Sequence, residues 1–211
     1  MGEINIKSST VEKSLELAKD FLQKLVGPSV DELGLLFADN VKLWRLKNQI
    51  TNLNKVERLV QKGNVDIKKI NLKILVPYLE GVSLEDDDDL QNLWANLFTN
   101  YIDTQKNLTL NVYPNILKQL STNEVSILKF MLLNGNSIAI GFRKSKDITF
   151  NDEEIANLER LGLIRETLEL SQYSGDHDRS NGQYKWNIEE VNSDDYYLTK
   201  FGTEFLHACE R

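Results

Sequence analysis

The first half of the chain repeats apolar residues at the three- and four-residue spacing of an α-helix. The first such run comprises Val11, Leu15, Ala18, Phe21, Leu22 and Leu25. Ser9 and Glu12 fit a capping box, in which a hydroxyl and a carboxylate satisfy free backbone N–H groups where a helix begins. Gly27 and Pro28 interrupt the run. The pattern therefore predicts a helix over about residues 10–26.

A second apolar pattern runs from about Val30 to Gly63 without a proline. Its apolar positions alternate three and four residues apart, as in a coiled coil. They are Leu36, Leu43, Leu46, Ile50, Leu53 and Val60. A straight helix of this length extends roughly 50 Å, which exceeds the core of a small domain. We therefore expect the helix to bend, to break near residues 48–54, to pack as a helical hairpin, or to project and form a homodimer.

The segment INLKILVPYLEGVS, residues 70–83, is strongly apolar but contains Pro77. Proline lacks a backbone N–H donor and disfavours helix in the residue before it. We therefore expect a break or kink near Val76, with a short turn of helix after it.

A core helix is expected after the acidic run SLEDDDD, residues 83–89. With Ser83 or Asp86 as the N-cap, the remaining acids fall in the first turn, where carboxylates oppose the positive end of the helix dipole. The helix has one continuous apolar face, made by Leu90, Leu93, Trp94, Leu97, Phe98, Tyr101 and Ile102. We interpret Trp94 as a packed core residue, because apolar helix faces turn to the interior.

The pattern changes after residue 120. A second capping box, Asn151 with Glu154, begins a short helix, and Gly162 is placed to end it in the left-handed conformation. Residues 163–170 and 184–190 alternate as two strands, with the polar segment 171–183 as the loop between them.

A final helix begins near Thr199. This order of elements, and the ending Leu198, Thr199 and Gly202, resembles a winged-helix domain. The fold class expected is mainly α, and α+β overall. A helical bundle with one long helix occupies residues 1–120, and a winged-helix-like domain with a two-stranded ribbon occupies residues 121–211.

The charge of the chain is unevenly spread. The net charge is −7, yet residues 42–73 hold nine basic and two acidic residues, and residues 80–89 hold six acids. Opposite potentials attract, so we expect these two segments to meet within the fold or across a dimer. A long uncharged apolar run and a signal region are both absent, which favours a cytoplasmic protein without a membrane segment.

Candidate chemistry is sparse. The sequence has none of the common phosphate-loop, zinc-protease or serine-hydrolase motifs, and the single Cys209 cannot form an internal disulfide. His207 lies two residues from Cys209, so the two side chains lie on different helix faces. The GDHD segment, residues 175–178, is interpreted as a solvated loop. We therefore expect no catalytic residue, no metal site and no cofactor; a metal-dependent hydrolase using residues 86–89 is a minor alternative.

Nucleic-acid binding is a second functional possibility. Residues 121–211 carry ten basic and sixteen acidic residues, whereas DNA affinity depends mainly on neutralising phosphates with Lys and Arg. The winged-helix-like part is therefore expected to contact protein rather than DNA. A nucleic-acid surface would instead use the basic stretch 42–73, with Lys42, Arg45, Lys47, Lys55, Arg58 and Lys62 as its contacts.

Three segments together resemble the abortive-infection alpha family of bacterial proteins. They are GPSVDELGLLFADNVKLWRLKN, ILVPYLEGVSLEDDDDLQNLWANLF and YPNILKQLSTNEVSILKFM, and the most specific positions include Pro77, Glu80 and Trp94. The resemblance covers about residues 27–135 and implies a role in phage defence. It carries over no catalytic residue, so we expect a protein that acts through a protein partner or self-association, for example as a homodimer through the helix 30–63.

Overall fold

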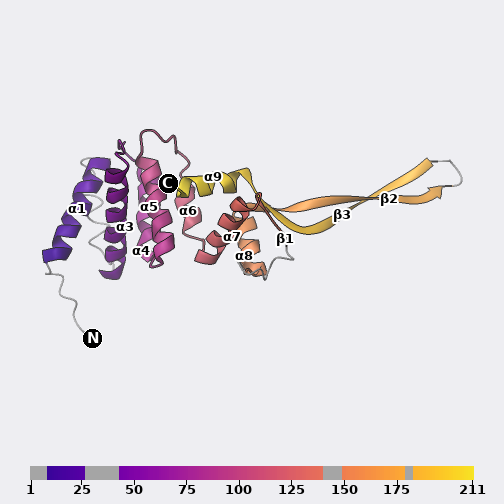
Figure 1. The fold of residues 1–211 in the computed structure, drawn as a ribbon, viewed down its shortest axis with the longest axis horizontal. Coiled ribbons are helices and arrows are strands. Elements are labelled where there is room, and N and C mark those ends of the chain that lie inside the picture. The colour runs from indigo at the N-terminus through magenta and orange to yellow at the C-terminus, as the bar shows by residue number, and fades with distance from the viewer. Residues whose placement is uncertain (1–8, 27–42, 140–148, 179–182) are drawn as a thin grey trace, which may run out of the picture. The chain divides into compact units, whose positions relative to one another are not determined.

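The computed structural model describes residues 9–26, 43–139, 149–178 and 183–211. The chain divides into two compact units (Figure 1). Unit 1 comprises Met1–Thr122 together with His207–Arg211, and unit 2 comprises Asn123–Leu206. The described elements are mostly helices, with one small antiparallel sheet, which confirms the expected mainly α fold class. No described helix is long and apolar enough to cross a membrane.

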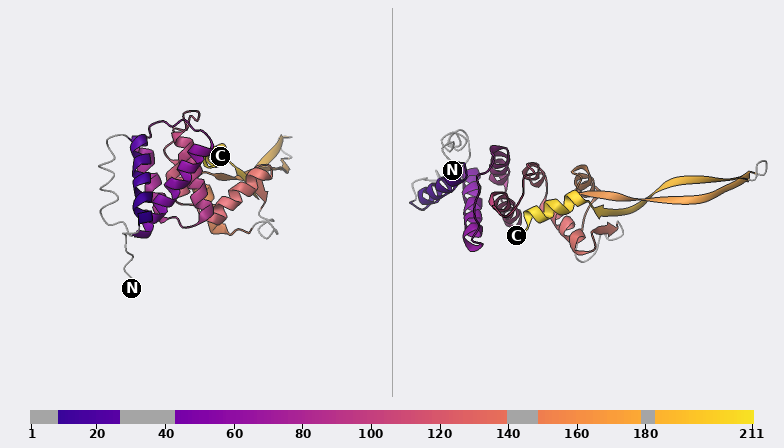
Figure 2. Two further views of the ribbon diagram at one scale, coloured as in Figure 1. Left: turned by 60° about the vertical axis from the view of Figure 1, so that its left-hand side comes forward. Right: turned by 90° about the horizontal axis from the view of Figure 1, so that it is seen from above.

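Unit 1 is built from helices. They are α1 (Ser9–Val26), α3 (Leu43–Lys62), α4 (Leu72–Leu84), α5 (Asp88–Ile102) and α6 (Tyr113–Leu117). Helix α3 packs against α1, α4 and α5, and α6 packs on α4. Two further views show α1 and α3 side by side (Figure 2). The helix expected over residues 10–26 is confirmed as α1, whose Phe21, Leu22 and Leu25 are buried.

Helix α3 runs unbroken through residues 48–54, where a break was one expectation. Its apolar stripe packs inside unit 1, since Ile50, Leu53 and Val56 are buried. Buried contacts along one face offset the low helix propensity of the asparagines. Residues 27–42, and with them the start of the expected long helix, lie outside the described part. A homodimer through residues 30–63 stays a prediction.

Of the break or kink expected near Val76, the break is wrong, because α4 continues through Pro77. A kink at this position stays a prediction. Proline removes one backbone hydrogen bond, to the first turn of the helix. The residues around it, Leu75, Tyr78 and Leu79, are buried. Their packing offsets the lost bond, so the helix persists. Asn71 caps α4 by accepting a hydrogen bond from the Lys73 N–H at 2.9 Å.

Aromatic rings form the centre of unit 1. Tyr78 stacks on Phe98, with ring centroids 4.0 Å apart, and meets Trp94 edge to face at 6.0 Å. Trp94 is fully buried, as expected. The Tyr78 hydroxyl donates to Asn52 Oδ1 at 2.6 Å, so a polar group in the core has a partner. Burial raises the pKa of Tyr78 well above its usual value, which keeps the phenol protonated.

Helix α5 begins later than either expected N-cap would place it. The N-cap is Asp87, rather than Ser83 or Asp86, and its carboxylate accepts from the Leu90 N–H at 2.9 Å. Ser83 instead ends α4 buried, with its hydroxyl donating to the Glu80 carbonyl oxygen. Two adjacent helices share the acidic run, and the sequence alone did not show where the first of them ends.

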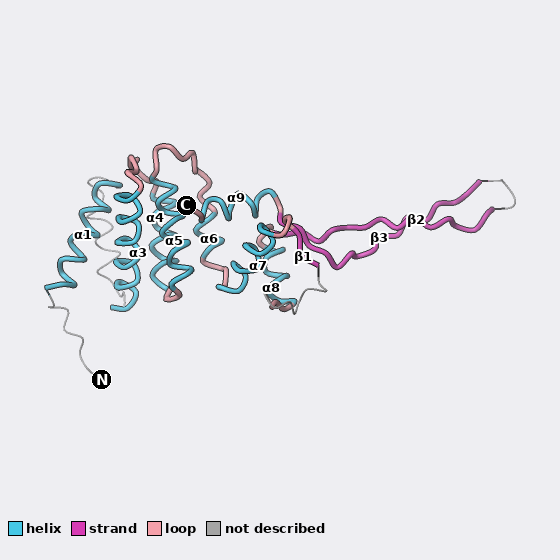
Figure 3. Tube along the Cα trace, viewed as in Figure 1, coloured by secondary structure: helices cyan, strands magenta, loops and turns pink. Residues whose placement is uncertain are grey.

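Unit 2 combines helices with a three-stranded sheet. Its elements are α7 (Thr122–Leu133), β1 (Ser137–Ala139), α8 (Asp152–Arg160), β2 (Ile164–Asp178), β3 (Gln183–Leu198) and α9 (Lys200–Cys209). The strand order is β1-β3-β2, with both pairings antiparallel. Figure 3 shows β2 and β3 as one long ribbon.

This ribbon is longer than the two strands expected at 163–170 and 184–190. Strand pairing continues from Ile164 opposite Leu198 to Asp178 opposite Gln183. The solvated loop expected at 171–183 is therefore wrong for residues 171–178, which include GDHD. Backbone pairing in a two-stranded ribbon needs no alternation of apolar side chains, so the polar composition was misleading. Residues 179–182 lie outside the described part.

The start and end of α8 and the start of α9 follow the capping and glycine signals predicted from the sequence. Asn151 and Glu154 form the expected capping box at α8, and Gly162 adopts φ 72°, which ends that helix. Thr199 precedes α9, and its hydroxyl accepts from the Gly202 N–H at 2.9 Å. A methyl group at Gly202 would overlap the Leu163 carbonyl oxygen, so glycine allows α9 to approach this turn.

Candidate functional site

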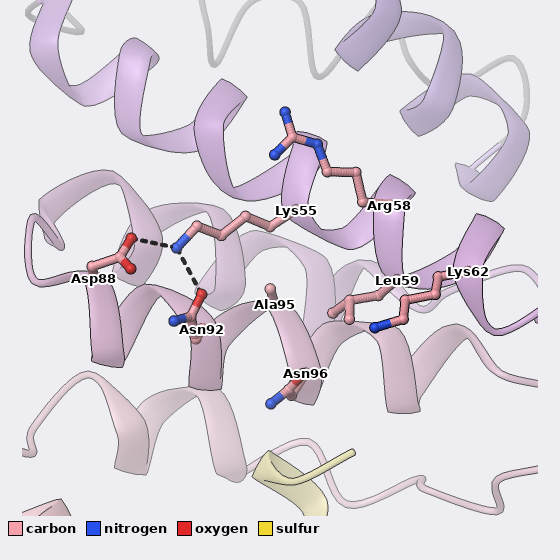
Figure 4. A pocket seen from close by; sticks show the side chains of 8 residues that line it. All are labelled: Lys55, Arg58, Leu59, Lys62, Asp88, Asn92, Ala95 and Asn96. Carbon is pink, nitrogen blue, oxygen red and sulfur yellow. Dashed lines mark hydrogen bonds and ion pairs between the residues drawn. The ribbon is translucent and has the colours of Figure 1, made fainter.

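A groove lies between helices α3 and α5 in unit 1. It has a volume of about 430 Å³ and contains basic, amide and apolar side chains (Figure 4). Helix α3 contributes Lys55, Arg58, Leu59 and Lys62, and α5 contributes Asp88, Asn92, Ala95 and Asn96. On each helix these residues are three or four positions apart, so each set lies along one face.

Helical periodicity explains why polar residues line the groove. On α5 the opposite face is buried, as Leu93, Trp94 and Leu97 show. Asp88, Asn92 and Asn96 repeat every fourth residue, outside that apolar face. Packing α3 against α5 brings this polar stripe beside the basic stripe of α3.

Lys55 is the basic residue of the groove that bonds across to α5. Its Nζ lies 2.6 Å from Asp88 Oδ1 and 2.7 Å from Asn92 Oδ1. The hydrogen bond from Lys55, followed by its positive charge, lowers the pKa of Asp88. The Lys55 side chain is only 21% exposed, whereas that of Asp88 is 84% exposed. Lys55 therefore joins the two helices and has little free charge to offer a ligand.

Arg58 and Lys62 are the available cations. Both are exposed, and neither forms an ion pair with another residue in the described ranges. Figure 4 shows Lys55 reaching toward α5, while the Arg58 guanidinium points away from α5. Leu59 lines the same groove and is partly exposed, whereas Ala95 is almost fully buried. The groove thus combines Lys62, which forms no ion pair with a described residue, with apolar and amide groups, and the charge of Arg58 lies on α3 turned away from α5. This mixture suits an acidic protein segment.

The structure divides the six basic residues proposed for nucleic-acid contact. Lys55, Arg58 and Lys62 line the groove, whereas Arg45 donates from Nε to the Ser83 hydroxyl at 3.2 Å. Lys47 is exposed on α3 outside the groove. Lys42 lies outside the described residues. Asn92 and Asn96 were not predicted from the sequence, although their four-residue spacing was an available signal.

The basic and acidic segments of the sequence meet at this site. The Lys55–Asp88 pair joins residues 33 positions apart, and Arg45 contacts the end of α4. The contact expected between the two segments is thus present within unit 1.

The positions that carried the family resemblance have structural roles. Trp94 is buried against Gly81, Pro77 is half-buried within α4, and Glu80 is exposed. None of the three lines the groove. In the described part of the chain, no three His, Cys, Asp or Glu side chains are grouped so as to hold a metal ion.

A family model described as Abortive infection alpha matches residues 40–209. The chain belongs to this family. The Abortive infection alpha match spans both helices of the groove and the whole of unit 2. No curated protein and no solved structure matches the chain. The family is named for abortive infection, in which an infected bacterium sacrifices its own growth to limit a phage, so the chain is associated with phage defence.

Proposed function

We propose that this member of the Abortive infection alpha family defends a bacterial cell from phage by contacting a protein in the cytoplasm. The observation that carries the proposal is the α3–α5 groove, where the exposed cations Arg58 and Lys62 lie on α3 beside the partly exposed Leu59. Interfaces with this mixture favour a partner that supplies both carboxylates and apolar side chains.

The charge balance of the groove supports a protein partner over a nucleic acid. Asp88 holds a carboxylate at the groove and is 84% exposed, while Lys55 is already neutralised by it. Phosphate binding relies on several free Lys and Arg side chains. Two free cations provide a small fraction of the contacts that a DNA-coating surface needs.

Phage plating tests the defence role. Cells that express the wild-type chain should show a lower plaquing efficiency for at least one phage in a broad panel. The double variant Arg58→Glu/Lys62→Glu should lose this protection, because the charge offered to an acidic partner is reversed. Lys47→Glu is the matched control, since Lys47 is exposed on the same helix outside the groove.

Three outcomes separate the parts of the proposal. Unchanged phage yield with the wild-type chain across the panel contradicts the defence role. Protection that survives in the double variant at equal protein level contradicts the groove as the contact site. Equal loss in the Lys47→Glu control points to net charge rather than to the groove.

A nucleic-acid-binding regulator is the second candidate. The free cations Arg58 and Lys62 favour it, and the β1-β3-β2 order with helices α7 and α8 supports a winged-helix interpretation of unit 2. It predicts binding to DNA or RNA that weakens steeply with salt and is lost in Lys55→Glu/Arg58→Glu. Absence of binding at low salt in a mobility-shift assay eliminates it.

A further inference from the structure

The net charge of the chain is concentrated on one element. Strands β2 and β3 contain eight acidic and two basic residues, a formal charge of −6 out of −7 for the whole chain. The remaining residues are therefore close to neutral. A potential this concentrated acts over the distance at which proteins first meet, about 10 Å at moderate salt.

Among the residues that the structure describes, the ribbon that carries this charge has no neighbouring strand over most of its length. Strand β1 pairs with β3 only at residues 195–197, near the base of the ribbon. From Leu168 to Asp178, β2 pairs with β3 alone, over roughly 35 Å at about 3.3 Å per residue. Within unit 2, Figure 1 shows the ribbon extending beyond α7 and α8.

The ribbon is poorly suited to adding another strand at its edge. Its pairing register shifts between Glu166 and Leu168 and again between Ser174 and His177. Such bulges twist an edge and protect it from pairing with a foreign strand. Acidic residues on an edge have the same effect. The net negative charge of the two strands favours a basic partner surface.

The chain itself carries a basic surface of the required kind. At the α3–α5 groove Lys55 is paired with Asp88, whereas Arg58 and Lys62 are exposed and free of ion pairs with other described residues. We propose that the β2–β3 ribbon of one copy docks in the α3–α5 groove of a second copy. This inference rests on the proposed function, because it names the protein partner of that same groove.

A contact between two different surfaces of identical chains is head-to-tail. Each copy keeps one free ribbon and one free groove after pairing, so the contact either closes into a ring or extends into a filament. The size of such an assembly then depends on the concentration of the protein.

Complementation between two defective variants tests the contact. The groove variant is Arg58→Glu/Lys62→Glu, and the ribbon variant is Glu169→Lys/Glu189→Lys/Glu190→Lys. Light scattering after size exclusion at low salt should show the wild type as oligomers and each variant alone as a monomer. Mixing the two variants should restore a dimer and nothing larger, since only one intact groove and one intact ribbon can meet.

Two controls separate the contact from a general charge effect. Glu153→Lys/Glu159→Lys changes exposed acids on α8 outside the ribbon and should leave the oligomers unchanged. Raising the salt should weaken wild-type association about tenfold or more, because screening shortens the range of the attraction. The salt series needs no variant, so it tests the contact even if a substituted chain fails to fold.

Several results would overturn the inference. These are a monomeric wild type at all concentrations, oligomers that persist in both variants or do not respond to salt, and a mixture that stays monomeric. A monomeric wild type whose phage protection is still lost in the groove variant leaves the proposed function in place and rejects only the second copy as its partner. If both variants still protect cells from phage, the function proposed for the groove is rejected.

Discussion

Single glycines set how closely the helices approach one another. The clearest case is Gly81 on α4, where a methyl group would overlap the ring of Trp94. Trp94 is fully buried and lies edge to face with Tyr78, so it has little room to move. The LEG sequence after Pro77 therefore has a packing reason, since only glycine leaves space for the indole.

Gly81→Ala should lower the free energy of unfolding by about 1–3 kcal/mol, the usual cost of overpacking a core. Trp94→Phe makes the ring smaller and relieves the overlap. The double variant Gly81→Ala/Trp94→Phe should therefore lose less stability than the sum of the two single changes. Urea unfolding monitored by circular dichroism measures all three. Strict additivity would show that the residues do not press on each other.

Neighbouring aspartates in the acidic run differ in their contribution to stability. Asp87 caps α5, whereas the Asp86 side chain is exposed beside it. Asp87→Ala should destabilise the protein by about 1 kcal/mol, because the Leu90 N–H loses its acceptor. Asp86→Ala should change stability by less than about 0.5 kcal/mol. Equal effects of the two substitutions in thermal or urea unfolding would contradict the assigned N-cap.

At the scale of elements, the pairing of α3 with α5 creates the groove and gives it a pH dependence. The hydrogen bond and charge of Lys55 lower the pKa of Asp88 below its usual value of 3.8. Burial raises the pKa of Glu85, at the end of α4, so this group has the opposite linkage. An experiment on pH and stability must therefore distinguish the contribution of Asp88 from that of Glu85.

The Lys55–Asp88 pair should stabilise the protein above pH 3.8, where Asp88 is ionised in both the folded and the unfolded chain. Its contribution should disappear as the pH falls through the lower pKa of the folded state, because protonation removes the negative charge. Comparing the melting temperatures of the wild type and Asp88→Asn across this range isolates the effect, since Glu85 is the same in both. A difference that stays constant with pH would contradict the assignment.

At the scale of the whole molecule, the end of the chain completes unit 1. The Asn100 amide donates to the carbonyl oxygens of Ala208 and Glu210, each at 2.9 Å. Arg211 pairs with the buried Asp103 at 3.0 Å. Unit 1 therefore needs residues more than a hundred positions apart, and helix α9, which begins in unit 2, ends in unit 1.

Arg211→Ala should destabilise unit 1 by about 1–3 kcal/mol, because it leaves the Asp103 carboxylate buried without its charged partner. Lys200→Ala is the comparison, since the Lys200–Glu204 pair is exposed and its ions lie 3.9 Å apart. Such surface pairs contribute less than about 1 kcal/mol. Chemical unfolding of both variants measures the difference. A similar effect of the two changes would argue against a structural role for Arg211.

The sequence by itself determined the features that depend on near neighbours. Helix α1, the core face of α5, the capping box at Asn151 and the glycine at 162 were all predicted, because helical periodicity and caps act over three or four residues. The family and the mainly α class also followed from the sequence. Such local signals predict the structure well where no contact with a distant residue opposes the local preference.

The tertiary structure decided what depends on distant residues. Packing around Tyr78 keeps α4 intact through Pro77, against the local preference of proline. Cross-strand pairing extends the β2–β3 ribbon through polar residues that were expected to form a loop. The groove exists only because α3 and α5 meet, which brings Lys55 to Asp88 across 33 positions. In each case many buried or paired contacts, distant in sequence, outweigh a single local preference.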